Sequence, residues 1–128
     1  MKIEHAACQV RDPVAVGQWY VQHLGMTVKR SQAESPFMRF LADDGDGVML
    51  EFYNNPAVEV PAYREMNPLV FHVAFLTDDV RGTRGRLLAA GATAEGEVSV
   101  TPAGDEIAML RDPWGLPVQL IKRRVPMI

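Results

Sequence analysis

The chain contains a single cysteine and no long apolar run. Cys8 alone cannot form an internal disulfide bond, and no stretch approaches the roughly 20 apolar residues that a membrane-spanning helix needs. The first residues carry Glu4 and His5 where a secretory signal would have its apolar core. These absences predict a cytoplasmic protein without a membrane partner.

Basic residues are also in the minority. Lys and Arg number 13 against 16 Asp and Glu, giving a formal net charge of −3. Because binding to nucleic acid needs a basic surface, this charge argues against nucleic acid as a partner. The chain has 128 residues, of which 48% are hydrophobic. That is enough for one compact domain, or for two small modules that share a core.

The two halves of the chain resemble each other. Four pairs of residues recur at offsets of 66 to 68 positions: His5 with His72, Asp12 with Asp79, Gly25 with Gly91, and Glu51 with Gln119. Such self-similarity at a nearly fixed offset is typical of a duplicated module, and the small drift fits short insertions. The sequence therefore predicts two copies of one structural unit.

Local patterns give each copy the order strand, helix and three strands. Asp12 and Asp79 are suitable N-caps, and Gly25 and Gly91 can end the helices. The expected helices cover residues 13–24 and 80–90, and the expected strands cover 2–10, 26–32, 36–42, 47–54, 69–77, 93–100, 105–111 and 116–122. We predict an α+β fold of two βαβββ modules, residues 1–54 and 69–128, joined by a proline-containing linker at 55–68.

Each of four expected strands carries one polar side chain on its otherwise apolar inner face. Strand alternation gives these four positions to His5, Glu51, His72 and Gln119. If the two sheets curve toward each other as a cup, the four side chains converge. Two imidazoles, a carboxylate and an amide oxygen suit one divalent cation such as Zn, Ni, Co, Mn or Fe. We therefore predict a metal site formed by these residues.

The same faces supply the expected substrate pocket. Its predicted lining is mostly apolar: Ala7, Gln9, Met49, Tyr53, Leu76, Trp114 and Ile121. Small apolar or aromatic compounds with a carbonyl or two neighbouring oxygens fit such a lining. Arg39 is a further candidate, which could pair with a substrate carboxylate or be an exposed charge at the edge of its strand.

These residues resemble the motifs of the vicinal oxygen chelate superfamily, which includes glyoxalase I, methylmalonyl-CoA epimerase, fosfomycin- and bleomycin-resistance proteins and extradiol dioxygenases. The resemblance covers nearly the whole chain and is carried by five fragments: His5 with Asp12-Pro13, Trp19-Tyr20 with His23-Leu24-Gly25-Met26, Leu50–Asn54, Phe71–Ala74, and Asp112–Leu120. It implies paired βαβββ modules around a metal-holding cup, usually in a homodimer. By matching positions it implies ligands at His5, Glu51, His72 and Gln119.

Two positions depart from the family pattern. Most metal-using members carry Glu at the position of Gln119, and an amide cannot accept a proton usefully at neutral pH. Glyoxalase I tends to place an arginine for glutathione where this chain has Gln9, which argues against glutathione. The pseudo-twofold repeat moves the carboxylate to Glu51, so the ligand set is that of methylmalonyl-CoA epimerase with its halves exchanged. We therefore predict Glu51 as the catalytic base.

Three functions fit this pattern. The first is a metal-dependent lyase or isomerase, similar to glyoxalase I or to an epimerase, that moves a proton next to a carbonyl group. The second is an Fe(II)-dependent extradiol-type dioxygenase with Glu51 as its anionic ligand. The third is a metal-free protein that binds a small molecule, as bleomycin-resistance proteins do.

Overall fold

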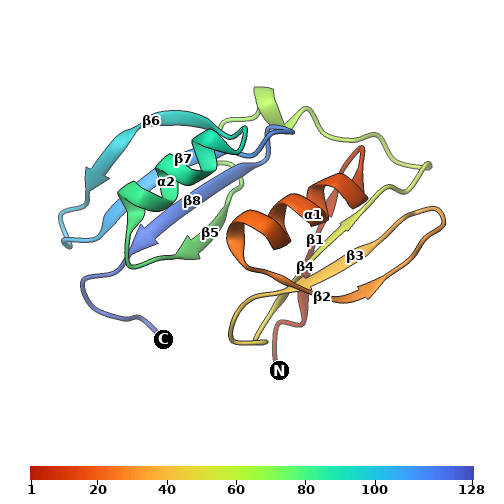
Figure 1. Cartoon of the computed structure of the whole chain (residues 1–128), viewed down its shortest axis with the longest axis horizontal. Coiled ribbons are helices and arrows are strands. Elements are labelled where there is room, and N and C mark those ends of the chain that lie inside the picture. Colours follow the sequence, from red (N-terminus) through yellow and green to blue (C-terminus); the bar gives the residue numbers. More distant parts are fainter. The chain divides into compact units, whose positions relative to one another are not determined.

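A computed structural model describes residues 1–128 and confirms the expected order of strand, helix and three strands, twice over (Figure 1). The strands are β1 His5–Gln9, β2 Thr27–Ser31, β3 Arg39–Ala42, β4 Met49–Tyr53, β5 Val73–Leu76, β6 Thr93–Val100, β7 Glu106–Arg111 and β8 Pro117–Lys122. The helices are α1 Pro13–Leu24 and α2 Val80–Ala89, with a short 3₁₀ turn, η1, at Tyr63–Glu65.

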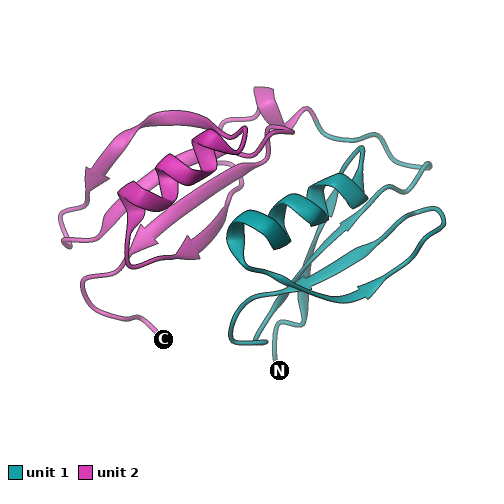
Figure 2. Cartoon of the chain, in the orientation of Figure 1, with its two compact units in different colours: residues 1–61 teal, residues 62–128 magenta.

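Each half forms its own mixed sheet. Sheet 1 has the strand order β1-β4-β3-β2 and sheet 2 has the order β5-β8-β7-β6. The pairs β1–β4 and β5–β8 are parallel, and all other pairs are antiparallel. The chain divides into two compact units, Met1–Pro61 and Ala62–Ile128, and each has one helix against one sheet (Figure 2). The predicted α+β fold of two βαβββ modules is thus confirmed.

The helix ends follow from the residues predicted for them. The Asp12 carboxylate accepts a hydrogen bond from the backbone N–H of Ala15, and Asp79 accepts one from Gly82. The two caps have nearly the same backbone angles, φ −131° and ψ 85° at Asp12, φ −133° and ψ 85° at Asp79. Gly25 ends α1 with a positive φ of 71°, a conformation that favours glycine. The duplication is therefore visible in the geometry of the helix caps.

The helix-facing side of each sheet forms the core of its unit. In unit 1 the rings of Tyr20 on α1 and Phe52 on β4 lie 4.8 Å apart, and both side chains are fully buried. In unit 2 Leu87 on α2 is buried together with Leu110 and Leu120 on the central strands. Burial of each such side chain stabilises the fold by about 1.5–3 kcal/mol. The opposite face of each sheet is not covered by the helix of its unit.

Two buried polar side chains hold the segment that connects the units. In unit 1 the Gln9 amide donates to the carbonyls of Asn55 and Val58, both at 2.8 Å, and accepts from the Asn55 N–H. In unit 2 Arg111, only 6% exposed, donates to the carbonyls of Tyr63 (2.6 Å) and Met66 (2.8 Å). Both ends of the segment predicted as a linker are therefore fixed by hydrogen bonds to a unit.

Two local expectations were wrong. β5 begins at Val73, four residues later than the strand expected at 69–77, so His72 precedes the strand. Arg39 lies on the helix-facing side of sheet 1, where its side chain stacks beside Gly17 of α1. Its guanidinium donates to the carbonyls of Gln32 and Met38. Arg39 therefore holds the loop before β3 and lies on the face of sheet 1 opposite the predicted substrate pocket.

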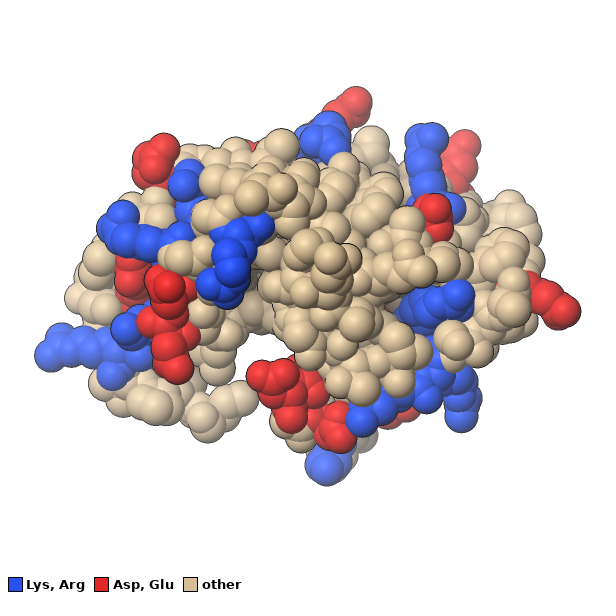
Figure 3. Space-filling view, in the orientation of Figure 1, with Lys and Arg blue, Asp and Glu red and all other residues tan.

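Charges of both signs are intermixed over the face of the molecule seen in Figure 3. Lysine and arginine side chains lie next to aspartate and glutamate in several places on this face, with uncharged side chains between these groups. No helix of this protein has the length and apolar character that crossing a lipid bilayer requires.

Asp105 links the turn before β7 to the residues that follow β8. Its carboxylate accepts from the backbone N–H of Arg124 at 2.9 Å and from the Arg123 guanidinium at 2.7 Å. These two donors, the backbone one first, hold the pKa of Asp105 below its usual value. A lowered pKa stabilises the folded state above the unfolded pKa of about 4, and the stabilisation is lost as the pH falls through the folded pKa.

Replacing Asp105 with Asn should therefore make the free energy of unfolding less dependent on pH below neutral. We expect the free energy of unfolding to change less between about pH 7 and pH 3 in Asp105→Asn than in the wild type. Urea unfolding at both pH values measures the difference. Asp44→Asn, at an exposed turn position, is the control and should keep the wild-type profile. Equal pH dependence in the wild type and Asp105→Asn would show that this carboxylate has no such role.

Candidate functional site

His5 and Glu51 lie together on the open face of sheet 1, the side away from α1. β1 pairs in parallel with β4, so that His5 stands beside Met49, and Ala7 beside Glu51. The His5 Nε2 and Glu51 Oε2 atoms are 3.6 Å apart. The Glu51 side chain is 18% exposed and that of His5 is 36% exposed. The predicted pair thus meets within unit 1 and remains open to small molecules.

The imidazole of His5 is oriented by two neighbours. Its Nδ1 bonds to the Glu4 carboxylate, and the Phe40 ring stands edge-on to it with the ring centres 5.3 Å apart. The hydrogen bond to Glu4 raises the pKa of His5, and the negative charges of Glu4 and Glu51 add to this, while partial desolvation opposes it. In a neutral ring that donates its Nδ1–H to this carboxylate, Nε2 carries the lone pair, and Nε2 is the atom that lies 3.6 Å from Glu51 Oε2.

The geometry of this pair fits two ligands of one cation. A separation of 3.6 Å is too long for a hydrogen bond. Two donor atoms at ordinary zinc distances and tetrahedral angles stand about 3.4 Å apart. A histidine that ligates a metal almost always donates its other ring N–H to a carboxylate or a backbone carbonyl. His5 has that arrangement with Glu4, a residue that the sequence analysis did not select.

In unit 2 the structure places the other two predicted ligands on neighbouring segments. His72 immediately precedes β5, and its Nδ1 donates to the Pro68 carbonyl at 2.9 Å, which leaves its Nε2 lone pair available. Gln119 lies at the centre of β8, between Ala74 of β5 and Met109 of β7. Both side chains are partly exposed. Neither unit by itself brings three His, Cys, Asp or Glu side chains together as a metal site.

The predicted substrate-binding residues fall on the open faces of both sheets. Met49 and Tyr53 flank Glu51 along β4 and are half-buried, and Ala7 is the β1 neighbour of Glu51. The amide of Gln9 is occupied by the backbone of residues 55–58. Within unit 1, Ala7, Met49 and Tyr53 therefore surround the candidate base.

In unit 2 two of the predicted lining residues are direct partners. Leu76 of β5 pairs with Ile121 of β8, and both line a hollow of about 560 Å³ together with the C-terminal residues Pro126, Met127 and Ile128. Trp114 lies in the β7–β8 turn and is half-buried. The Arg64 guanidinium donates to the Pro113 carbonyl of that turn at 2.8 Å, so η1 lies beside it.

Sequence reasoning missed three residues next to the candidate site. Glu4 was not selected as a site residue, and it precedes the first residue of β1, where strand alternation does not apply. Phe40 and Arg30 share one cross-strand pair because the β2–β3 register shifts between Val28 and Arg30. A bulge of this kind has no reliable signal in a single sequence.

The sequence model described as "Glyoxalase/Bleomycin resistance protein/Dioxygenase superfamily" matches residues 2–120. The chain belongs to this superfamily. Members of the glyoxalase/bleomycin resistance/dioxygenase superfamily often bind a divalent metal, and the superfamily contains both enzymes and binding proteins. Among curated proteins, none matches the chain.

Solved structures of the superfamily show the same fold. SMU.1112c is 29% identical, with a TM-score of 0.73 over 94% of this chain and 98% of that one. A family enzyme from Burkholderia phytofirmans PsJN is 24% identical, with a TM-score of 0.77 over 95% and 98%. TnmS3, an antibiotic binding protein from Streptomyces sp. CB03234, is 22% identical, with a TM-score of 0.74 over 96% of each chain.

Proposed function

We propose that this chain is a divalent-metal-dependent lyase or isomerase, similar to glyoxalase I or to an epimerase, that moves a proton next to the carbonyl group of a small molecule. The observation that carries the proposal is the approach of His5 Nε2 and Glu51 Oε2 to 3.6 Å, with His5 Nδ1 occupied by Glu4. His72 supports the proposal, because its Nδ1 bonds to the Pro68 carbonyl and the lone pair of its Nε2 is left available to a cation. Gln119 completes the proposed ligand set.

The candidate ligands have a composition that suits catalysis of this kind. A bound dication would polarise the carbonyl oxygen of the substrate and so make the neighbouring C–H more acidic. In the proposal His5, His72 and Gln119 hold the ion as neutral ligands. Glu51 would supply the only negative charge of the ligand set, so that a bound dication would keep a net positive charge with which to stabilise an oxyanion.

Glu51 has the features that a general base needs. One carboxylate oxygen faces His5, and Oε1 has no hydrogen-bond donor. Its neighbours Ala7, Met49 and Phe40 are apolar and hold a substrate close to the carboxylate. In the proposed reaction Oε1 takes the proton from the carbon next to the carbonyl and returns it to the product.

Metal content tests the proposal most directly. Protein purified without tag or chelator is expected to carry about one divalent ion per chain, measured by elemental analysis. His5→Ala and His72→Ala should each lose the ion, since loss of even an outer-shell partner costs roughly 10- to 100-fold in metal affinity. His23→Ala is the matched control, because His23 packs against Trp19 on α1 and should leave the metal in place.

Each result distinguishes one candidate function. A wild-type protein without metal would refute the proposal and favour a small-molecule binding role, like that of its structural neighbour TnmS3, an antibiotic binding protein. Bound iron together with oxygen uptake on a catechol would favour the dioxygenase. If His72→Ala keeps its metal while His5→Ala loses it, the ligands of unit 2 are wrong. The homodimer and the cytoplasmic location stay predictions.

A further inference from the structure

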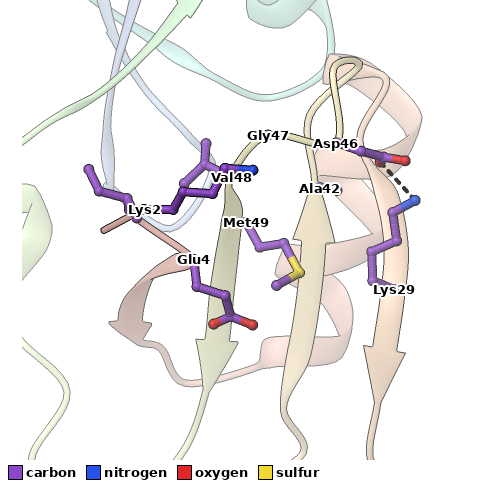
Figure 4. Close-up of a pocket in the computed structure, with 9 residues that line it drawn as sticks. Lys2, Glu4, Lys29, Ala42, Asp46, Gly47, Val48 and Met49 are labelled. Atoms are coloured by element: carbon purple, nitrogen blue, oxygen red, sulfur yellow. Dashed lines mark ion pairs between the residues drawn. The ribbon is translucent and has the colours of Figure 1, made fainter.

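A small hollow lies on the open face of sheet 1 beside the His5–Glu51 pair. It has a volume of about 160 Å³ and is lined by Glu4, Lys29, Arg30, Phe40 and Met49. We call it the Arg30 hollow. A second hollow at the end of the same sheet shares Glu4, Lys29 and Met49 with it. Figure 4 shows this second hollow, with the Met49 side chain between the Glu4 carboxylate and Lys29. The floor is therefore apolar and the rim is charged.

The strand register connects the Arg30 hollow to the candidate base. Glu51 on β4 pairs directly with Phe40 on β3, and Phe40 pairs with Arg30 on β2. Directly paired residues point to the same face of a sheet, so the three side chains form one row on the open face. Neighbouring strands stand about 4.8 Å apart, which puts the Glu51 and Arg30 backbones about 10 Å apart. A molecule lying over Phe40 can reach both ends of the row.

Arg30 is the one cation of the Arg30 hollow without a partner. Lys29 pairs with the Asp46 carboxylate at 2.7 Å, seen as a dashed line in Figure 4, and the Glu4 carboxylate is bonded to His5. No hydrogen bond or ion pair joins the Arg30 side chain to the rest of the protein. Its guanidinium presents a planar set of donors that matches an anionic oxygen group such as a carboxylate.

We infer that the substrate is a carbonyl compound with a flat apolar body and an anionic oxygen group, bound by Arg30 at the end of the row opposite Glu51. The substrate class rests on the proposed function, because Glu51 is taken as the base. Phe40 supports the flat body, Glu51 stands at the carbonyl end, and Arg30 selects for the anion. Arg30 is thus a specificity-determining residue.

A matched pair of ligands tests the inference. The probes are 4-acetylbenzoate, which has an acetyl group and a carboxylate across one ring, and its methyl ester, which lacks the charge. Titration calorimetry of the full chain should show that wild type binds the acid about tenfold more tightly than the ester, as one charge-assisted contact implies. Arg30→Met should abolish this preference and leave binding of the ester unchanged. Arg11→Met changes an exposed arginine of unit 1 that lines neither hollow. This control variant should keep the preference for the acid.

Failure of the inference and failure of the proposed function give different results. The titrations are run on protein as purified and on protein treated with chelator, because Arg30 does not belong to the proposed ligand set. A preference for the acid that depends on Arg30 supports the inference. If the same preference is found in a protein that never carries metal, only the lyase or isomerase proposal is refuted. Equal binding of acid and ester by wild type, or an unchanged preference in Arg30→Met, would overturn the inference.

Discussion

Glu51→Gln is expected to retain metal and to lose turnover by about 10²- to 10⁴-fold, the range that a positioned general base contributes. The substitution keeps the size of the side chain and one carbonyl oxygen, which can still face His5. It removes the ability of Oε1 to accept a proton. Gln already serves as a proposed ligand at position 119, so an amide at position 51 is compatible with a bound cation. Metal binding and turnover should therefore respond differently in this variant: the metal is retained and turnover is lost.

The readout need not depend on knowing the product. Proton removal next to a carbonyl exchanges that hydrogen for deuterium in D₂O, and NMR spectroscopy follows the exchange on a panel of small carbonyl compounds. Metal content is measured on the same samples. Glu34→Gln, at an exposed loop position, is the matched control and should exchange at the wild-type rate. If Glu51→Gln keeps both its metal and the wild-type exchange rate, Glu51 is not the base.

The same variant also separates the enzyme hypotheses. A dioxygenase would use Glu51 as the anionic ligand of iron, so the substitution would weaken iron binding and oxygen uptake together. The lyase or isomerase proposal instead predicts that proton exchange falls while the ion remains. The metal content of Glu51→Gln therefore distinguishes a ligand whose charge is essential for holding the ion from a ligand whose other carboxylate oxygen acts as the base.

The modular fold could be predicted because its signals are local. An aspartate before each helix and a glycine after it act through hydrogen bonds within a few residues, and both cap aspartates have the conformation expected of them. Alternation along β1 and β4 then placed His5 and Glu51 on one face, where they are 3.6 Å apart. That half of the candidate site follows from strand period and pairing alone.

The residues that sequence reasoning missed depend on non-local geometry. The β2–β3 bulge brings Arg30 beside Phe40, and a register shift of one residue would turn Arg30 to the other face. Arg39 was only a candidate for a substrate carboxylate or an exposed strand-edge charge, whereas its stem lies beside Gly17 on α1. Arg111 was not selected at all, since a strand arginine looks like a solvent-exposed charge until the segment that covers it is known.

Arg111→Met should lower the free energy of unfolding by about 1–3 kcal/mol, the cost of leaving buried carbonyl groups without their hydrogen-bond donor. The Arg111 guanidinium joins the Glu95 carboxylate to the carbonyls of Tyr63, Met66 and Gly115. Methionine fills much of the volume but donates no hydrogen bond, so Glu95 and three carbonyls lose their donor. Segment 63–66 would then detach from sheet 2.

The comparison with a surface arginine isolates this effect. Arg81 makes an exposed pair with Glu106 at 3.1 Å, so Arg81→Met removes the same groups at a site where an ion pair is worth about 1 kcal/mol or less. Urea unfolding of both variants, followed by circular dichroism, gives the two losses, and proteolysis near Arg64 reports release of the segment. A loss below about 1 kcal/mol in Arg111→Met would mean that water replaces the guanidinium and that packing alone holds η1 on unit 2.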